Sequence, residues 1–194
     1  MRILVIYVHP NRKSFNRALA DAVLEEAEAK GHEYELRDLY AQSFQPVLTN
    51  DDFEAFNHAA IPDDIKREQD AVTRADLVIF VYPIWWFGPP AILKGWIDRV
   101  FSYGFAYGHD TRGVKPLLTG RKAILVNTAG GSETEAFQTV EFKDAMTTVI
   151  DTGIFEFVGL DVILHRMFFQ VPSATAEERR EMLETIRNDM RKLL

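Results

Sequence analysis

The sequence predicts an α/β domain in which a five-stranded parallel sheet carries helices on both faces. Apolar runs at residues 3–8, 76–82 and 122–127 have the composition of strands that are covered on both sides. Segments with helical periodicity separate these runs along the chain, and such alternation indicates parallel pairing through right-handed crossovers. The chain has 194 residues, no linker-like stretch and no internal repeat. We therefore expect one domain over residues 1–194.

The first half of the chain supplies a strand, a helix, a strand, an irregular segment with one short helix, a helix and a strand. The expected ranges are 3–8, 14–31, 33–39, 40–62, 63–75 and 76–82. Ser14 is a suitable N-cap for the first helix, and Gly31 is a suitable stop. The apolar residues of this helix fall on one face, namely Phe15, Leu19, Ala22, Val23 and Ala27.

The second half continues the alternation, with helices over 91–101, 138–154 and 175–194 and strands over 122–127 and within 159–171. Trp96 is expected in the core or at a dimer interface. The helix over 138–154 is expected to turn one face inward, made of Phe142, Ala145, Met146, Val149 and Gly153. The last helix is amphipathic, with Met182, Ile186, Met190 and Leu193 in line.

Composition excludes several classes of function. The net charge is −7 and the basic residues are scattered among acids, which argues against nucleic acid as a partner. There is no cysteine, so disulfides, thiol nucleophiles and cysteine-ligated metals are excluded, and we expect no metal site. The apolar run at the N-terminus is too short for a signal-peptide core, and no run reaches transmembrane length. A cytoplasmic protein without membrane insertion is expected.

The loops that follow the first, third and fourth strands are unusual, and ligands of parallel sheets bind at such strand ends. The loop after the first strand leads into a helix N-terminus, where free backbone N–H groups favour an anion. Arg12 and Lys13 add charge there, Ser14 and Asn16 add hydrogen-bonding groups, and His9 sits at the strand end. Dinucleotide and P-loop fingerprints are absent. An ordinary capped turn would have the same residues.

The loop after the third strand is the strongest signal, because it places Trp85, Trp86 and Phe87 where a sheet meets solvent. Exposed aromatic clusters mark an interface or a flat ligand. Pro89 and Pro90 stiffen this loop. Residues 128–132 read TAGGS, and glycine lets the backbone approach a ligand closely. A phosphate cradle, an aromatic wall and a glycine turn together predict a bound flavin, with dimer packing as the alternative use of the aromatic side chains.

These segments resemble a known family. PIWWFGPPAILKGWIDRVFSYGFAYG at 83–108 is similar to the signature of the NAD(P)H:quinone oxidoreductases of the DT-diaphorase type. HPNRKSFNRAL at 9–19 and TAGGS at 128–132 resemble the first and third loops of that family. The resemblance covers nearly the whole chain in the same order. It implies a flavodoxin-like three-layer sandwich with strand order 2-1-3-4-5 and a homodimer with two flavin sites at its interface.

The resemblance also implies roles for individual residues. The phosphate side of the flavin would be bound by His9, Ser14, Phe15 and Asn16. The isoalloxazine would be lined by Pro83, Ile84, Trp85, Trp86 and Phe87, largely through their backbone. Its other edge would meet Thr128, Ala129, Gly130 and Gly131. Tyr107 matches a tyrosine that covers the partner's site, and His109, which replaces a second aromatic residue, is a candidate substrate contact, as is His58. A surface histidine is an equally good interpretation of both.

The sequence departs from the family at one point. Better-known animal members have a tyrosine and a histidine after the glycine turn, thought to relay charge during hydride transfer. Ala136 and Phe142 stand at these positions here, so that relay is missing. The proton donor is therefore unassigned.

The implied activity is two-electron transfer from NADPH or NADH through the flavin to a quinone or a related acceptor, by a ping-pong mechanism. FAD is favoured over FMN, because the resemblance is closer to FAD-binding members and residues 40–62 are long enough to help hold an adenine. Alternatives are a flavodoxin-like electron carrier, a flavin-binding regulatory or ancillary subunit of a potassium-efflux system, and a nitro- or azo-reductase. The choice between NADH and NADPH stays open.

Overall fold

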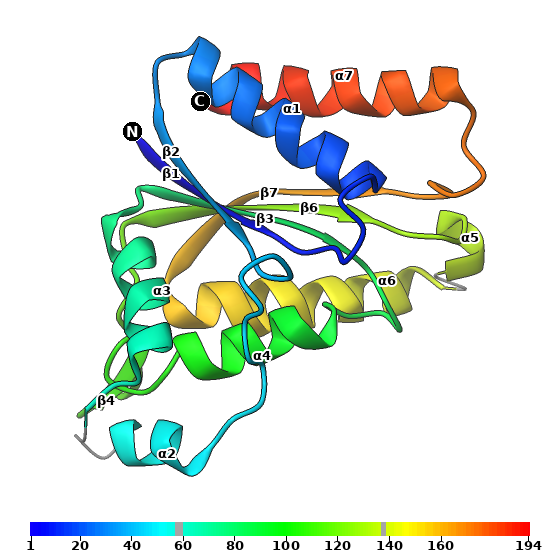
Figure 1. Ribbon diagram of the computed structural model, residues 1–194. Helices are drawn as coiled ribbons and strands as arrows, with labels where there is room; N and C mark the ends of the chain where they lie inside the picture. Colours follow the sequence, from blue (N-terminus) through cyan, green and yellow to red (C-terminus); the bar gives the residue numbers. More distant parts are fainter. Residues whose placement is uncertain (57–59, 137–138) are drawn as a thin grey trace.

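A computed structural model shows a central parallel sheet between two helical layers (Figure 1). It describes residues 1–56, 60–136 and 139–194. The sheet consists of β1 (Arg2–Tyr7), β2 (Glu33–Asp38), β3 (Leu77–Pro83), β6 (Arg121–Thr128) and β7 (Leu160–Phe168), in the order β2-β1-β3-β6-β7. Counted within this sheet alone, the order is the expected 2-1-3-4-5. The fold class predicted from the sequence is therefore confirmed.

The helices divide between the two faces of the sheet (Figure 1). Helices α1 (Phe15–Ala29) and α7 (Ala176–Leu193) cover one face. Helices α3 (Asp63–Arg74), α4 (Ala91–Val100) and α6 (Val140–Thr147) cover the other. The short helices α2 (Asn50–Phe56) and α5 (Glu133–Ala136) lie in connections. Each face has its own apolar cluster, because neighbouring residues of a strand point to opposite sides.

Several local expectations are met. Ser14 accepts the amide of Arg17 and caps α1, and Gly31 adopts φ +72° just beyond the helix. Ile186 and Met190 of α7 are fully buried. Trp96 is also fully buried, and its Nε1 donates to Glu68 Oε2 at 3.0 Å, so it belongs to the core. The side chains of Trp85, Trp86 and Phe87 are exposed, as expected for this loop.

One expectation is wrong, and one element was not expected. The segment 138–154 is not one regular helix, because α6 passes into the π-helix η1 (Thr148–Phe155), followed by a 3₁₀ turn, η2 (Glu156–Val158). Of the five residues expected to face inward, only Met146 is buried, whereas Phe142, Ala145, Val149 and Gly153 are exposed. The wider π turn changes the face of the later residues, so that Ile150 is buried in place of Val149. Phe142 precedes that turn and packs on Phe87 instead. The sequence also gave no sign of the antiparallel hairpin β4 (Tyr107–Asp110) and β5 (Gly113–Pro116).

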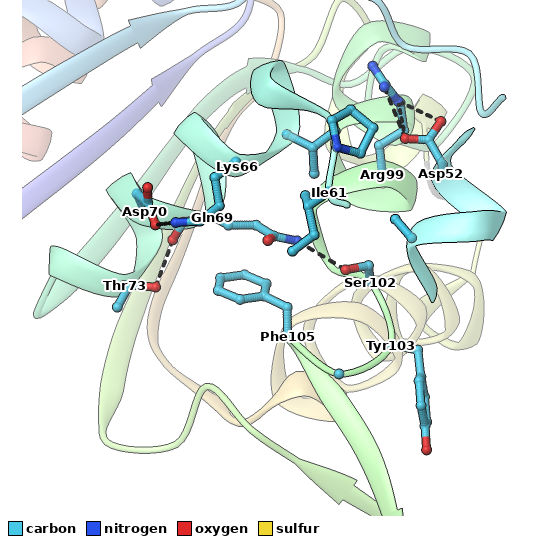
Figure 2. Close-up of a pocket in the computed structure, with 14 residues that line it drawn as sticks. Asp52, Ile61, Lys66, Gln69, Asp70, Thr73, Arg99, Ser102, Tyr103 and Phe105 are labelled. Atoms are coloured by element: carbon cyan, nitrogen blue, oxygen red, sulfur yellow. Dashed lines mark hydrogen bonds and ion pairs between the residues drawn. The ribbon is translucent and has the colours of Figure 1, made fainter. Parts of the chain in front are cut away.

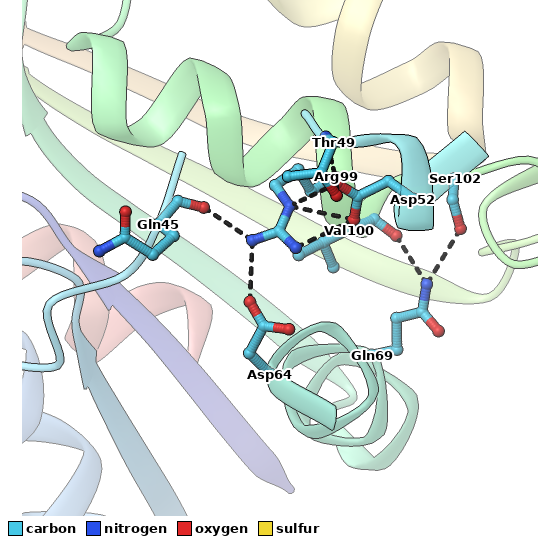
Figure 3. A network of polar contacts seen from close by, with 8 residues as sticks. All are labelled: Gln45, Thr49, Asp52, Asp64, Gln69, Arg99, Val100 and Ser102. Atoms are coloured by element: carbon cyan, nitrogen blue, oxygen red, sulfur yellow. Dashed lines mark hydrogen bonds and ion pairs between the residues drawn. The ribbon is translucent and has the colours of Figure 1, made fainter. Parts of the chain in front are cut away.

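A buried polar network fastens the irregular segment and α2 to α4 (Figure 3). Arg99 of α4 donates to both carboxylate oxygens of Asp52 at 3.0–3.1 Å, and to Asp64 Oδ2 and the Gln45 carbonyl oxygen at 2.8 Å each. Burial by itself raises the pKa of Asp52, but the bonds from Arg99 and Thr49 outweigh it and hold the pKa below its usual range. The network fixes the chain that runs beside the helix, and through it the position of α4.

Candidate functional site

A groove of about 1000 Å³ lies at the carboxyl ends of β1, β3 and β6. The loops that the sequence singles out supply most of its wall. Of the predicted site residues, the groove is lined by His9, Ser14, Phe15, Asn16, Pro83, Ile84, Trp85, Trp86, Thr128, Ala129 and Gly130. Phe87 and Gly131 are neighbours of lining residues in the chain but are not part of the lining. The three loops therefore converge on one site.

The loop after β1 is fixed by its own hydrogen bonds. His9 Nδ1 lies 3.0 Å from the amide nitrogen and 3.2 Å from the carbonyl oxygen of Asn11, so the backbone of Asn11 fixes the orientation of the ring. Burial lowers the pKa of His9, and the backbone of Asn11 offsets only part of this effect. The Asn11 side chain accepts the amide of Lys13 at 2.8 Å, and Ser14 then starts α1. The loop thus delivers the first turn of α1 to the groove in a defined orientation.

This end of the groove is suited to an anion. The amides of Phe15 and Asn16, in the first turn of α1, have no intrahelical acceptor. Lys13 lines the groove, whereas Arg12 points to Asp38 at 3.9 Å and does not. A second cation, Arg179 of α7, also lines the groove and is held by the carbonyl oxygens of the loop after β7. Free amides and cations of this kind are the groups that bind phosphate in proteins.

Sequence reasoning named Lys13 as a charge of the first loop but missed Arg179, Asn11, Ala18, Val171 and Pro172. No local pattern could have found Arg179, because it is one of several basic residues of an amphipathic helix. Its guanidinium donates to the carbonyl oxygens of Val171 at 3.1 Å and Pro172 at 3.2 Å. Only the packing of α7 beside the ends of β6 and β7 brings it to the groove.

The loop after β3 forms a tight turn with strained geometry. The Trp85 amide donates to the Gly88 carbonyl at 3.0 Å, and the Gly88 amide donates to the Trp85 carbonyl at 3.2 Å. The two central residues, Trp86 and Phe87, adopt φ +50° and +61°. Bulky residues rarely adopt this region, which glycine and asparagine prefer, and such strain costs about 1–3 kcal/mol per residue. It leaves Trp86 96% exposed beside the groove.

The aromatic side chains of this loop have partners on two sides. His9 and Trp85 contact edge to face, with ring centroids 6.1 Å apart. Phe87 packs edge to face on Phe142 of α6, with centroids 4.9 Å apart. Phe142, one of the two positions of the missing relay, therefore supports the aromatic loop. Ala136, the other, is the last residue of α5.

The end of β6 is hydrogen-bonded to the ends of both neighbouring strands, β3 and β7. The Ile84 amide donates to the Thr128 carbonyl oxygen at 2.8 Å, and the Ala129 amide donates to the Phe168 carbonyl oxygen at 2.8 Å. Asn16 Nδ2 donates to Thr128 Oγ1 at 2.7 Å, whereas the buried Asn16 Oδ1 has no partner among the described residues. A Cβ added at Gly130 would meet no protein atom within 4 Å, so this glycine faces open space in the groove.

Tyr107 and His109 are not part of this groove. They belong to β4, beyond the C-terminal end of α4, whereas the aromatic loop precedes the N-terminal end of that helix. Tyr107 contacts the rings of Tyr103 and Phe157 with centroids 5.8 and 5.6 Å apart, and His109 contacts Tyr103 at 5.8 Å. His58 lies outside the described residues.

A second cavity, of about 380 Å³, lies between α3, the end of α4 and the following loop (Figure 2). Its polar side chains are engaged with one another. Gln69 Nε2 donates to Ser102 Oγ at 3.0 Å, Thr73 donates to the Gln69 carbonyl oxygen at 2.8 Å, and Lys66 pairs with Asp70. Because these groups satisfy each other, the groove is the better candidate for a polar ligand.

Among the described residues, no helix is long and apolar enough to cross a membrane.

Comparisons with known proteins agree with this geometry. Residues 1–192 match a family described by its flavodoxin-like fold. A Haemophilus influenzae protein named uncharacterized NAD(P)H oxidoreductase is 33% identical over 95% of this chain and 91% of its own length. Human ribosyldihydronicotinamide dehydrogenase [quinone] is 33% identical over 94% of this chain and 87% of its own. An NAD(P)H:quinone oxidoreductase from Methanothermobacter marburgensis superposes with a TM-score of 0.88 at 29% identity, covering 100% of this chain and 96% of that one. The chain therefore belongs to the flavodoxin-like family of NAD(P)H:quinone oxidoreductases.

Proposed function

We propose that the groove binds a flavin and that the chain uses it to pass two electrons from NADPH or NADH to a quinone or a related acceptor. The main support for this proposal is that one groove contains both a cationic helix N-terminus and an aromatic wall. A flavin is a phosphorylated chain joined to a flat ring, so it requires both features together. Two of the proteins compared above, the human and the Methanothermobacter marburgensis enzymes, are named for quinone as acceptor, which supports this choice of reaction.

Details of the groove fit such a ligand. Lys13, Arg179 and the first amides of α1 would hold the phosphate. The unpartnered Asn16 Oδ1 would accept a hydroxyl of the ribityl chain, which removes the cost of leaving a buried acceptor unsatisfied. The space above Gly130 leaves room for a ring edge against the backbone. FAD stays favoured over FMN, as the sequence suggested.

The flavin supplies the redox chemistry when bound, by accepting a hydride equivalent from the nicotinamide and passing two electrons to the acceptor. The protein supplies position and electrostatics. Ile84 and Trp85 exclude water from the wall of the groove, and the backbone of residues 128–130 presents fixed dipoles. The imidazole of His9, held by the backbone of Asn11, supplies a polar group beside the anion-binding end. A single groove for donor and acceptor predicts ping-pong kinetics.

We further propose a homodimer in which Tyr107 and His109 cover the groove of the partner subunit. Both residues are remote from the groove of their own chain. The cluster around them exposes apolar rings, with Tyr103 40% and Phe157 45% exposed. Light scattering after size exclusion tests the assembly. A monomer at micromolar concentration would exclude this arrangement.

Gly130→Val tests the flavin site. Gly130 lines the groove and a Cβ added there meets no protein atom within 4 Å, so the protein should fold normally and lose its flavin. Gly130→Ala, with a smaller side chain, should give an intermediate affinity. Flavin released by heat is identified as FMN or FAD by chromatography, and bleaching by anaerobic NADPH followed by recolouring with menadione tests the reaction. Retained colour and turnover in Gly130→Val would refute this placement of the ring.

A further inference from the structure

A buried polar chain lies beside the groove and is not explained by the proposed function. It connects Asp151 of η1, His165 of β7 and Asn127 of β6. His165 Nδ1 lies 2.7 Å from Asp151 Oδ1, and His165 Nε2 lies 2.5 Å from Asn127 Oδ1. The side chain of His165 is only 7% exposed and that of Asp151 16%. Buried polar groups of this kind are costly unless each is satisfied, so their arrangement is informative.

The donors and acceptors of this row of polar side chains can be assigned from the groups at its two ends. Asn127 Nδ2 faces the Tyr82 carbonyl oxygen at 3.4 Å, and a carbonyl can only accept. Asn127 Oδ1 therefore faces His165, and His165 Nε2 donates to it. At the other end, a carboxylate accepts from Nδ1. His165 thus bridges two oxygen acceptors, the Asp151 carboxylate and the Asn127 amide oxygen.

The position of Asn127 gives the chain its significance. Asn127 directly precedes Thr128, where the glycine turn of the groove begins. The two side chains point to opposite faces of the sheet: Thr128 bonds Asn16 of α1 at 2.7 Å, and Asn127 bonds His165 beneath η1. The end of β6 is therefore held from both helical layers at consecutive residues. Each of these two hydrogen bonds restricts the direction in which the glycine turn leaves β6.

Tyr82 gives Asn127 an alternative partner. The Tyr82 hydroxyl is buried and has no hydrogen-bond partner among the described residues. Burial, together with the nearby Asp151 carboxylate, raises its pKa, and the Asn127 amide acts in the opposite direction. The Asn127 amide group therefore already lies near this hydroxyl, and His165 holds its Oδ1. Loss of His165 should release Oδ1 and shift the end of β6 rather than leave it unchanged.

We propose that His165, held by Asp151, is a positioning residue that fixes the glycine turn at 128–131 in its flavin-binding geometry. The inference rests on the proposed flavin site. His165 itself does not line the groove and acts only through Asn127. The π-helix supplies Asp151, and π turns are frequent at functional sites.

The test compares His165→Gln and Asp151→Asn with Arg166→Gln. Glutamine cannot donate to both partners in this geometry. Arg166 is the next residue of β7 and forms an ion pair with Asp189 of α7 on the other face, so its variant controls for loss of a polar contact on the same strand. Apoprotein is titrated with the flavin that wild-type protein retains. Amide NMR shifts of Gly130 and Gly131 are measured without flavin.

The expected result is a flavin Kd at least about tenfold higher in both test variants, the effect of one charge-assisted hydrogen bond on an equilibrium constant. The double variant of His165→Gln with Asp151→Asn should bind flavin no more weakly than either single variant. The visible flavin band and the amide shifts of the two glycines should change in the test variants. Arg166→Gln should leave all three readouts unchanged. Variants that lose thermal stability but keep the wild-type Kd, flavin spectrum and glycine shifts would overturn the proposal. If wild-type apoprotein binds neither FMN nor FAD, the proposed function fails as well, which is a distinguishable outcome.

Discussion

Replacing Arg99 with methionine should be among the most damaging single changes in this protein. Arg99 is 5% exposed and Asp52 2% exposed. Arg99→Met keeps the apolar volume of the side chain but removes its bonds to Asp52, Asp64 and the Gln45 carbonyl oxygen (Figure 3). Asp64 is 37% exposed and can be hydrated instead, whereas Asp52 is left as a buried, unpaired charge.

The magnitude follows from that unpaired charge. Removing one partner of a buried ion pair costs about 3–5 kcal/mol. A domain of this class has roughly 5–15 kcal/mol of stability in total. At about 2–4 °C per kcal/mol for a chain of this size, the midpoint of thermal unfolding should fall by roughly 6–20 °C.

Urea denaturation of the apoprotein near pH 7, followed by tryptophan fluorescence and circular dichroism, measures the effect. The double variant Arg99→Met with Asp52→Asn should regain much of the loss, because no charge is then left unpaired. Lys94→Met is the matched control, since Lys94 and Asp98 form an exposed pair on the same helix. That control should lose no more than about 1 kcal/mol. A loss below about 1 kcal/mol in Arg99→Met, or a double variant as unstable as the single one, would refute the reasoning.

Three further predictions concern stability and the aromatic loop. Gly95→Ala should lower the free energy of unfolding, measured in urea, by about 1–2 kcal/mol despite the better helix propensity of alanine, because the new Cβ would lie 2.0 Å from the Pro46 carbonyl oxygen. The control Gly153→Ala should be nearly neutral, because its Cβ meets only the Thr148 carbonyl oxygen at 3.7 Å. Equal effects of the two substitutions would contradict this reasoning. Trp86→Gly should leave the stability of the apoprotein unchanged or raise it by up to about 2 kcal/mol, because glycine adopts a φ of +50° without strain. The same substitution should weaken flavin binding in a titration. A clear loss of stability would show that the turn is not strained. The pKa of Asp52 is lower in the folded state, so its stabilisation is present above the unfolded value near ~3.9 and is lost as the pH falls through the folded pKa. The difference in unfolding free energy between wild type and Asp52→Asn should therefore shrink from about pH 4 downward, and a constant difference would argue against this linkage.

The sequence alone determined the alternation of strands and helices, both helical layers and the three loops that meet at the groove, while the strand order followed from the family resemblance. It could do so because the information is local: apolar runs define buried strands, Ser14 and Gly31 define a helix, and clustered aromatic residues next to prolines define an unusual loop. Parallel topology then brings the ends of β1, β3 and β6 to one edge. The central residues of the site follow from these rules without a structure.

Tertiary structure decided the features that depend on distant partners. Arg179 joins the groove only because α7 packs beside the ends of β6 and β7, and Asp151, His165 and Asn127 meet from three separate elements. The π-helix changed the later part of the expected inward face of 138–154, because a wider turn rotates the residues that follow it. The positive φ of Trp86 and Phe87 contradicts their local preference. Each of these is fixed by contacts across the fold, and local residue patterns carry no record of such contacts.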